Sequence, residues 1–388
     1  MQWIRKAAGA IAIVATLASL VAHAQDSVYL PMVLELTGAG AVSGTNFRDG
    51  ATMAIDEINA KGGILGKKIT TSVSDTQSNP GISRAQLQRA IDADPYAILG
   101  PIFSGSIKAD MNLSQQAEIP QFVGGEAAEL TQMGNPYLFR TAFGQQVAMP
   151  KIANYLADEL KAKNVALLWI NNDFGKGGRD GFLKAMAARG IHVVADISTE
   201  QNQVDFSPDI LKVKNARPDA LFIYLNEEES ARALKEARKQ GVQMPIVGDT
   251  NLFSQKVIEL SGDAANGIRG HIGLSAEAPI PGVQEFKSKF EKRFHYVPDH
   301  NGIKGYLAVY AIKYATEKQG KLDRKLLAKT MHGLTITPKD EPGILIETTW
   351  DDKGEINRVS FLVEVVNGRQ TIVQTLPKLA TPRLASSN

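Results

Sequence analysis

The run Val-Ala-Leu-Leu-Trp-Ile at positions 165–170 is apolar at every position. A short, uniformly apolar run is typical of a strand buried on both faces of a parallel sheet. Helical apolar spacing follows in residues 178–188, and residues 192–195 return to a β-branched pattern. A strand, a helix and a second strand in this order predict a right-handed βαβ unit.

The same alternation extends along the chain in both directions from this unit. Upstream, we expect strands at 28–34, 68–74, 96–99 and 121–123, and helices at 46–59, 83–92, 106–117 and 147–160. Downstream, we expect strands at 220–224 and 246–248, and helices at 227–239, 281–294 and 301–317. After about residue 340 the pattern predicts a hairpin of 343–349 with 359–366, joined through 351–354. Two successive runs of alternation predict two α/β lobes.

Length and composition narrow the class of protein. The 388 residues suffice for two or three domains, and 44% hydrophobic with 22% charged residues is ordinary for globular chains. A formal charge of +2 gives no basic excess, so we expect no nucleic-acid partner. The absence of cysteine excludes disulfides, cysteine-bound metals and an N-terminal lipidated cysteine.

The N-terminal segment has the three parts of a secretory signal peptide. Arg5 and Lys6 precede an uncharged apolar run over 7–22, and Ala22-His23-Ala24 forms a small-residue cleavage site. This run is short for a membrane anchor, which needs roughly 20 apolar residues. We therefore expect residues 1–24 to be removed and the rest to be exported. The mature chain would keep 41 of the 43 Lys and Arg, against 41 Asp and Glu.

Motifs for catalysis, cofactors and metals are nearly absent. The sequence has no GxSxG, HExxH or Walker A motif, and its glycine-rich sites at 61–63 and 176–178 lack phosphate-loop spacing. His295 and His300 flank Pro298, so they do not share a helix face and we expect no metal site. We expect no enzyme activity and no cofactor. Two α/β lobes that face each other form a cleft suited to a small ligand.

Several segments carry a family likeness. Leu36-Thr37-Gly38 and the run AIDEINAKGGILG at 54–66 resemble the opening of type I periplasmic binding proteins of the leucine/isoleucine/valine-binding group. These proteins are the substrate-binding components of ABC importers. Further matching positions follow in the same order over residues 28–370: Asp75, Pro80, Gly100-Pro101, Ser104, Ile119-Pro120, Phe139-Arg140-Thr141, Asp173-Phe174-Gly175, Asp219 and Gly248.

The resemblance implies two Rossmann-like lobes with parallel central sheets, joined by three hinge crossovers in a Venus-flytrap arrangement. Lobe 1 would comprise 25–141 and 275–340, lobe 2 would comprise 142–274 and 341–376, and 377–388 would be a C-terminal tail. The crossovers would fall near 141–144, 270–275 and 339–348.

The resemblance also places ligand-binding residues in lobe 1. Ser104, beside Phe103, lies in the loop whose hydroxyl and amide groups hold the ligand carboxylate in the family; the alternative is a serine that only caps a helix. The next loop would contribute Gly125, Glu126 and Ala127. Glu126 is unusual there, and it would hold a ligand amine or a second polar group, or point to solvent.

Other positions depart from the family pattern. Phe174 matches an aromatic residue that covers the ligand, although a core role is equally open. Asn226 stands where a tyrosine is frequent, and Ser43 replaces an aromatic lining residue. Thr250 stands where branched-chain binders carry a glutamate for the α-amino group, and Asp249 beside it would take that role. The ligand is therefore left open between a branched-chain amino acid, another amino acid, and an aromatic or aliphatic acid.

The function implied by the resemblance is that of a periplasmic solute receptor. We expect a monomer, free in the periplasm, that binds a small carboxylate or amino-acid ligand and delivers it to a membrane permease of an ABC importer. Two alternatives remain open: a sensor with the same fold that feeds a signalling partner, and a secreted hydrolase, which the missing motifs disfavour.

Overall fold

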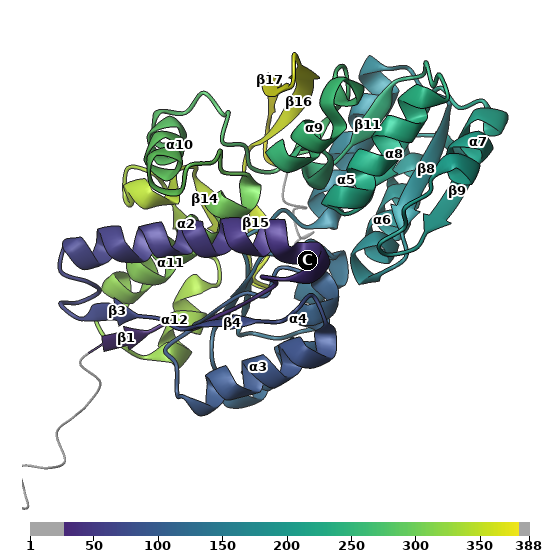
Figure 1. The fold of residues 1–388 in the computed structure, drawn as a ribbon. Helices are drawn as coiled ribbons and strands as arrows, with labels where there is room; N and C mark the ends of the chain where they lie inside the picture. Colours follow the sequence, from purple (N-terminus) through teal and green to yellow (C-terminus); the bar gives the residue numbers. More distant parts are fainter. Residues whose placement is uncertain (1–26, 380–388) are drawn as a thin grey trace, which may run out of the picture.

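The computed structural model describes residues 27–379. The predicted signal peptide and positions 380–388 of the predicted tail lie outside the described residues. Figure 1 shows two α/β bodies, one purple, blue and light green, the other teal and green. Over 27–379, no helix combines the length and the apolar character that a membrane crossing requires.

The first body is built on a parallel sheet with the order β4-β2-β5-β6-β7. Its strands are β2 (Met32–Leu34), β4 (Val73–Asp75), β5 (Ile98–Leu99), β6 (Gln121–Val123) and β7 (Leu138–Arg140). β1 (Ser27–Tyr29) and β3 (Lys68–Thr70) form a separate parallel pair beside it. The strands predicted at 28–34 and 68–74 are therefore each split in two. Pro31, which has no amide hydrogen, lies at the first break.

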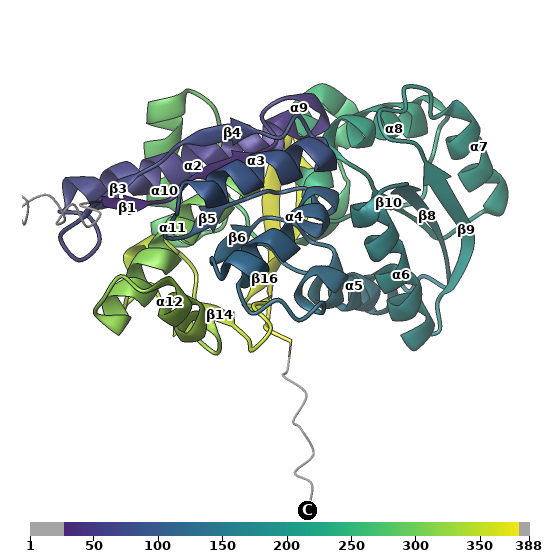
Figure 2. The same ribbon diagram turned by 90° about the horizontal axis from the view of Figure 1, so that it is seen from below.

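Helices cover both faces of this sheet. Val33 and Ile98 pack with Leu87, whereas the alternate residues Met32 and Leu99 belong to the cluster of Phe47. This alternation follows the two-residue period of a strand. In Figure 2, α3 and α4 lie in front of the sheet. The helices of this body are α2 (Ala41–Ala60), α3 (Pro80–Asp92), α4 (Ser104–Ala117), α10 (Pro281–Phe294), α11 (His300–Gln319) and α12 (Arg324–Met331).

The second body holds a seven-stranded sheet with the order β17-β16-β12-β11-β10-β8-β9. The predicted buried strand is confirmed as β8, and β8 to β12 are parallel whereas β16 and β17 are antiparallel at one edge. These strands are β8 (Asn164–Ile170), β9 (His192–Thr199), β10 (Ala220–Tyr224), β11 (Ile246–Gly248), β12 (Arg269–Ile272), β16 (Ser360–Val366) and β17 (Arg369–Leu376). The helices are α5 (Gln145–Asn154), followed by a π-helical turn (Tyr155–Glu159), α6 (Asp173–Ala188), α7 (Ser207–Ala216), α8 (Glu227–Lys239) and α9 (Gln255–Ser261).

The predicted hairpin of 343–349 with 359–366 is wrong. β14 (Thr348–Trp350) pairs with β13 (Thr335–Ile336) and β15 (Ile356–Asn357), while β16 pairs with β12 and β17. The physical reason is an anchor on β7, because the indole of Trp350 and the carbonyl of Gly354 both bond to the backbone of Arg140, each at 2.9 Å. This anchor holds β14 and β15 beside the first body.

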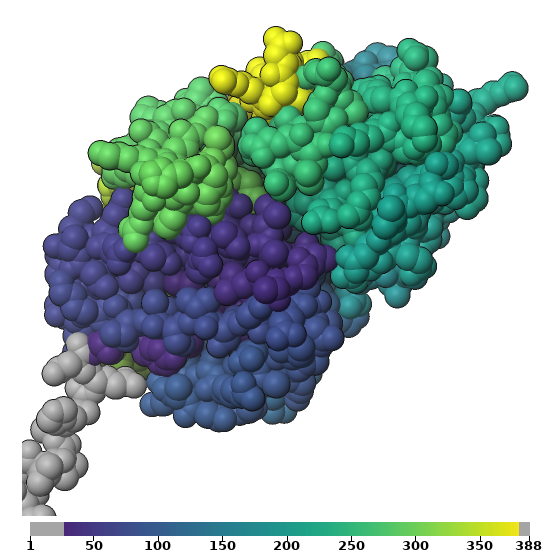
Figure 3. Space-filling model, in the orientation of Figure 1, coloured from purple at the N-terminus to yellow at the C-terminus, as the bar shows by residue number. Residues whose placement is uncertain are grey.

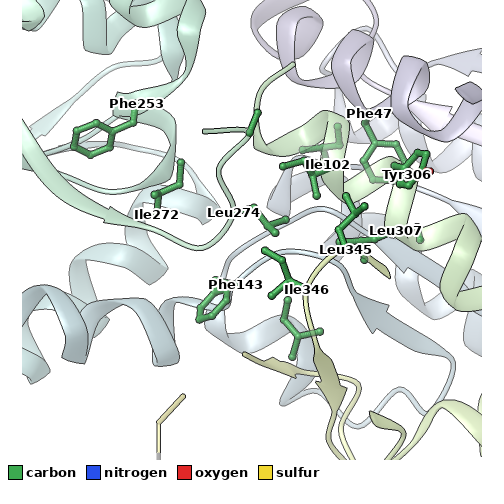
Figure 4. Close-up of a cluster of buried hydrophobic side chains, with 14 of the residues drawn as sticks. Phe47, Ile102, Phe143, Phe253, Ile272, Leu274, Tyr306, Leu307, Leu345 and Ile346 are labelled. Carbon is green, nitrogen blue, oxygen red and sulfur yellow. The ribbon is translucent and has the colours of Figure 1, made fainter. Parts of the chain in front are cut away.

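Three connections join the two bodies. They lie at 141–144, at 273–280 and at 358–359, so the third comes later than predicted because β14 and β15 stay with the first body. Figure 4 shows Phe143 and Leu274 of the first two connections in one buried cluster with Ile346. The ranges assigned to lobe 1 and lobe 2 stay predictions, and residues 348–357 are the part of the predicted lobe 2 that pairs elsewhere.

Helices α2 and α11 approach each other through glycines. A Cβ atom added at Gly50 would lie 1.9 Å from the carbonyl oxygen of Gly302, and one at Gly305 would lie 2.1 Å from that of Phe47. No side chain fits at these separations without moving one helix backbone. The glycines therefore set the distance between α2 and α11, and with it the position of the cleft-facing end of α11.

We predict that Gly50→Ala lowers the free energy of unfolding by about 1–3 kcal/mol, because overpacking outweighs the better helix propensity of alanine. Urea denaturation followed by circular dichroism measures this change. Gly282→Ala, in the first turn of α10, is the matched control. A Cβ atom at Gly282 would come no closer than 3.7 Å to its nearest neighbour, Leu345. Equal stability of the two variants would contradict the prediction.

Candidate ligand-binding site

A cavity of about 830 Å³, its open mouth included, lies between the two bodies. In the space-filling view of Figure 3, the purple and teal elements meet directly on the face shown. The cavity lies at the carboxyl ends of the parallel strands, where α/β proteins bind ligands. Its lining residues are Ser43, Ser78, Pro80, 102–106, 124–126, 172–174, Lys176, Gln201, Asn226, Asn251, Asn301 and Lys304.

The N-terminus of α4 opens into the cavity. Ser104, Gly105 and Ser106 form its first turn and line the cavity, and the N-cap residue Phe103 makes no side-chain capping bond. Uncapped first-turn amides and the helix dipole together favour an anionic group.

Glu35 shapes the turn that leads into α4. Its buried carboxylate accepts hydrogen bonds from the amides of Ile102 and Phe103 at 3.0 Å and 3.2 Å. Burial raises the pKa of Glu35, and these two hydrogen bonds oppose the rise. Because Glu35 occupies the amides before the helix, the amides that remain for a ligand are those of the first turn itself.

The hydroxyl oxygen of Ser104 is joined to the neighbouring loop, accepting a hydrogen bond from the amide of Ala127 at 3.2 Å. The same loop is held from behind by Arg140, whose guanidinium donates to the carbonyls of Gly125 and Ala127 and pairs with Glu355 at 2.9 Å. Arg140 is fully buried. The loop is therefore fixed relative to both β7 and α4.

Glu126 and Lys304 form an ion pair inside the cavity. Lys304 Nζ lies 3.1 Å from Glu126 Oε1 and donates to the carbonyl of Gly124 at 3.3 Å. Both side chains are almost completely buried, at 7% and 4% exposure. Burial raises the pKa of Glu126, and the charge of Lys304 opposes this rise.

The lining residues of the second body include an aromatic residue and a buried asparagine. Phe174, near the start of α6, stacks on Tyr224 with 4.3 Å between ring centroids. Asn226 occupies the cap position of α8, and its Nδ2 is buried without a hydrogen-bond partner among the described residues. Across the cleft, Asn301 Oδ1 is likewise buried and unpartnered within the described part of the chain. A buried donor and acceptor that both lack partners indicate a polar ligand group.

Polar side-chain contacts cross between the bodies around the cavity. The Ser43 hydroxyl donates to Glu227 Oε1 at 2.5 Å, and Lys108 Nζ lies 3.2 Å from Asp173 Oδ1. Desolvation raises the pKa of Glu227 to about 7, against the effect of the Ser43 hydrogen bond. The structure is therefore a closed arrangement, with side chains from both bodies in contact around the cavity.

Seven of the ten predicted site residues line the cavity: Ser43, Phe103, Ser104, Gly125, Glu126, Phe174 and Asn226. Ala127 lies behind it and contributes its amide to Ser104. Asp249 and Thr250 are outside the lining as well. Asp249 is buried against His271, 2.9 Å from Nδ1, and accepts from the hydroxyl of Thr250. Roles in ligand binding stay predictions for all ten residues.

Sequence reasoning missed most of the polar residues with which the second body lines the cavity. It also missed the two lining residues of α11, Asn301 and Lys304. Asn301 and Lys304 come from a helix nearly 200 residues away from Ser104 in the chain. The available signal was Lys304 itself, a lysine within the uniformly buried start of α11. Among residues 27–379, no group of three His, Asp or Glu is placed to hold a metal ion.

Comparison with known proteins places this geometry in a family. The profile of the periplasmic binding protein family matches residues 27–370. A curated relative is the leucine-, isoleucine-, valine-, threonine- and alanine-binding protein of Pseudomonas aeruginosa. It is 24% identical over 348 residues, which cover 88% of this chain and 90% of that protein.

Two solved structures share the fold. A leucine-binding protein from Thermotoga maritima has a TM-score of 0.82 and 21% identity, covering 90% of this chain and 99% of its own. A solute-binding protein of an ABC transporter from R. palustris, solved with benzoate, has a TM-score of 0.83 and 19% identity. The match covers 92% of this chain and 98% of that protein. The chain belongs to the periplasmic binding protein family, whose profile spans nearly all of the residues that the structure describes.

Proposed function

We propose that this protein captures a small carboxylate-bearing ligand, an amino acid or a related organic acid, in the cavity between its two lobes. It then delivers the ligand unchanged to the membrane permease of an ABC importer, from the periplasm. The observation that carries the proposal is the uncapped N-terminus of α4, which opens with Ser104 into a cavity lined from both bodies. This arrangement suits a carboxylate.

Capture would proceed by closure of the cleft. The ligand carboxylate binds first to Ser104 and the first-turn amides of α4, which belong to the first body. The second body then closes, bringing Phe174 and Asn226 to the ligand and forming the contact between Ser43 and Glu227. A ligand shifts such an equilibrium because it contacts both bodies only in the closed form.

The charges of the cavity favour an acid without an amine as a second, narrower candidate. Two carboxylates line the cavity, and each already has a lysine partner: Glu126 has Lys304, and Asp173 has Lys108. Asp249, the predicted partner of an α-amino group, instead contacts His271. An ammonium group would therefore have to displace a lysine. The aromatic rings of Phe103 and Phe174, one from each body, suit an aromatic acid such as benzoate.

A thermal-shift screen of the mature chain tests the proposed function. The probes are leucine and alanine, benzoate and 4-hydroxybenzoate, and acetate, each compared with the matching amide, for instance benzamide. A ligand that binds only the folded state raises the melting temperature according to its affinity and concentration. We expect at least one carboxylate to raise it while its amide does not. Equal shifts with the amides, or none with any carboxylate, would refute the proposal.

We predict that Ser104→Ala weakens binding of the carboxylate found in that screen by about 1–3 kcal/mol, as expected when a charged group loses a buried partner. Isothermal titration calorimetry measures the dissociation constant. Ser114→Ala is the matched control, because it removes a buried hydroxyl bonded to Gln121 near the far end of α4. An unchanged dissociation constant in Ser104→Ala would show that Ser104 does not hold the ligand.

A further inference from the structure

The ion pair of Lys304 and Glu126 lies beside the place proposed for the ligand carboxylate. Lys304 Nζ bonds to Glu126 Oε1 and to the carbonyl of Gly124, both on the loop 124–127. Ser104 Oγ is bonded to the amide of Ala127, at the other end of the same loop. One loop of four residues therefore joins the serine that would hold the carboxylate to the lysine.

This proximity creates a conflict of charges. A carboxylate at Ser104 gains from the nearby ammonium of Lys304, but it also comes close to the negative charge of Glu126. Both partners are nearly buried, so the repulsion is screened little by solvent. Two carboxylates that share one buried cation are poorly compensated, and one of them is then more stable as the neutral acid.

The ionisable groups around Lys304 and Glu126 do not cancel the repulsion between Glu126 and a ligand carboxylate. Burial raises the pKa of Glu126, and the charges of Lys304 and Arg140 lower it while that of Asp249 raises it. Asp249 is itself in contact with His271.

Further ionisable groups face the pair. Burial raises the pKa of the Tyr224 phenol, and the nearby charge of Glu126 raises it further. On the side of α11, burial raises the pKa of Asp299 to about 6 and the charge of Lys304 opposes this rise, whereas burial and then the charge of Lys304 both lower the pKa of His300. Arg140 is already shared among two loop carbonyls and Glu355, so it offers the ligand no free cation.

We propose that the ligand carboxylate replaces Glu126 as the partner of Lys304, and that Glu126 takes up one proton from solvent as the ligand binds. The inference rests on the proposed function and narrows its ligand to an acid without an amine. The oxygen–hydrogen bond forms on the Glu126 carboxylate, and the resulting acid is able to donate a hydrogen bond. Lys304 is thereby a ligand-binding residue, and Glu126 sets the specificity for anions over zwitterions.

The sign of the pH dependence follows directly. A proton taken up on binding means that the complex holds more protons than the free protein, so affinity falls as pH rises. The fall is up to about tenfold per pH unit for one proton, over the interval between the free and bound pKa values of Glu126. The ligand is already an anion throughout the range from about pH 6 to about pH 9, because ordinary carboxylic acids have pKa values near about 4.

Calorimetric titration with benzoate or 4-hydroxybenzoate, whichever binds more tightly, tests this proposal. The wild-type protein is titrated at several pH values in phosphate and in Tris, whose different ionisation enthalpies reveal the number of protons taken up. We expect uptake in the wild type and about one proton less in Glu126→Gln, which should also bind the acid several-fold more tightly near the upper end of the pH range. Lys304→Met should lose most of the affinity.

Asp110→Asn is the matched control, because Asp110 is another buried carboxylate whose pKa burial raises to about 7, but it accepts from Ser83 and does not line the cavity. This variant should retain the proton uptake of the wild type. Uptake that persists in Glu126→Gln, or that disappears only in Asp110→Asn, would overturn the proposal. So would tight binding of leucine that Glu126→Gln abolishes, since Glu126 would then hold an amine. All of these outcomes leave the proposed function intact, because each requires that a carboxylate binds, whereas a chain that binds no carboxylate refutes that function itself.

Discussion

The buried guanidinium of Arg140 is the interaction on which the cleft depends. Its side chain holds the carbonyls of Gly125 and Ala127, and its backbone holds Trp350 and Gly354. Arg140 thus connects the loop 124–127, strand β7 and the segment that contains β14 and β15. A buried arginine without these acceptors would be strongly destabilising. The first connection between the bodies starts at the next residue, so the same interaction fixes where the hinge begins.

The sequence predicts the elements whose own pattern is continuous. The strands at 220–224 and 246–248 and the helices at 227–239 and 281–294 have the observed bounds, because burial on every face or along one stripe leaves a clear local periodicity. The predicted elements are wrong where a contact with a residue far away in the sequence determines how a strand pairs. Residues 343–349 look like one arm of a hairpin, yet the bond from Trp350 to Arg140 holds β14 beside β7. No local pattern encodes that bond.

The residues of the candidate site likewise fall into those that the sequence predicts and those that it does not. Residues in the loops that follow β5 and β6 are predictable, because strand ends of a parallel sheet converge on one edge. Lys304 is not, because α11 returns to the first body only after the chain has built most of the second. Asp249 is a different case: its position after β11 suggests a ligand partner, and in the structure His271 from the adjacent strand lies 2.9 Å from its carboxylate. Position along a strand predicts proximity to the cleft, whereas charge pairing decides which carboxylates remain for a ligand.

The two side-chain contacts that join the bodies across the cavity, Lys108 with Asp173 and Ser43 with Glu227, are individually weak. Lys108 and Asp173 are each about 40% exposed, and such pairs contribute about 0–1 kcal/mol. The hydrogen bond of Ser43 to Glu227 contributes about 0.5–1.5 kcal/mol, and the desolvation of Glu227 opposes it. Moving a two-state equilibrium from 1:99 to 99:1 takes about 5.5 kcal/mol. In the proposed closure, a ligand that contacts α4 on one side and Asn226 on the other supplies the part of this difference that these two contacts do not.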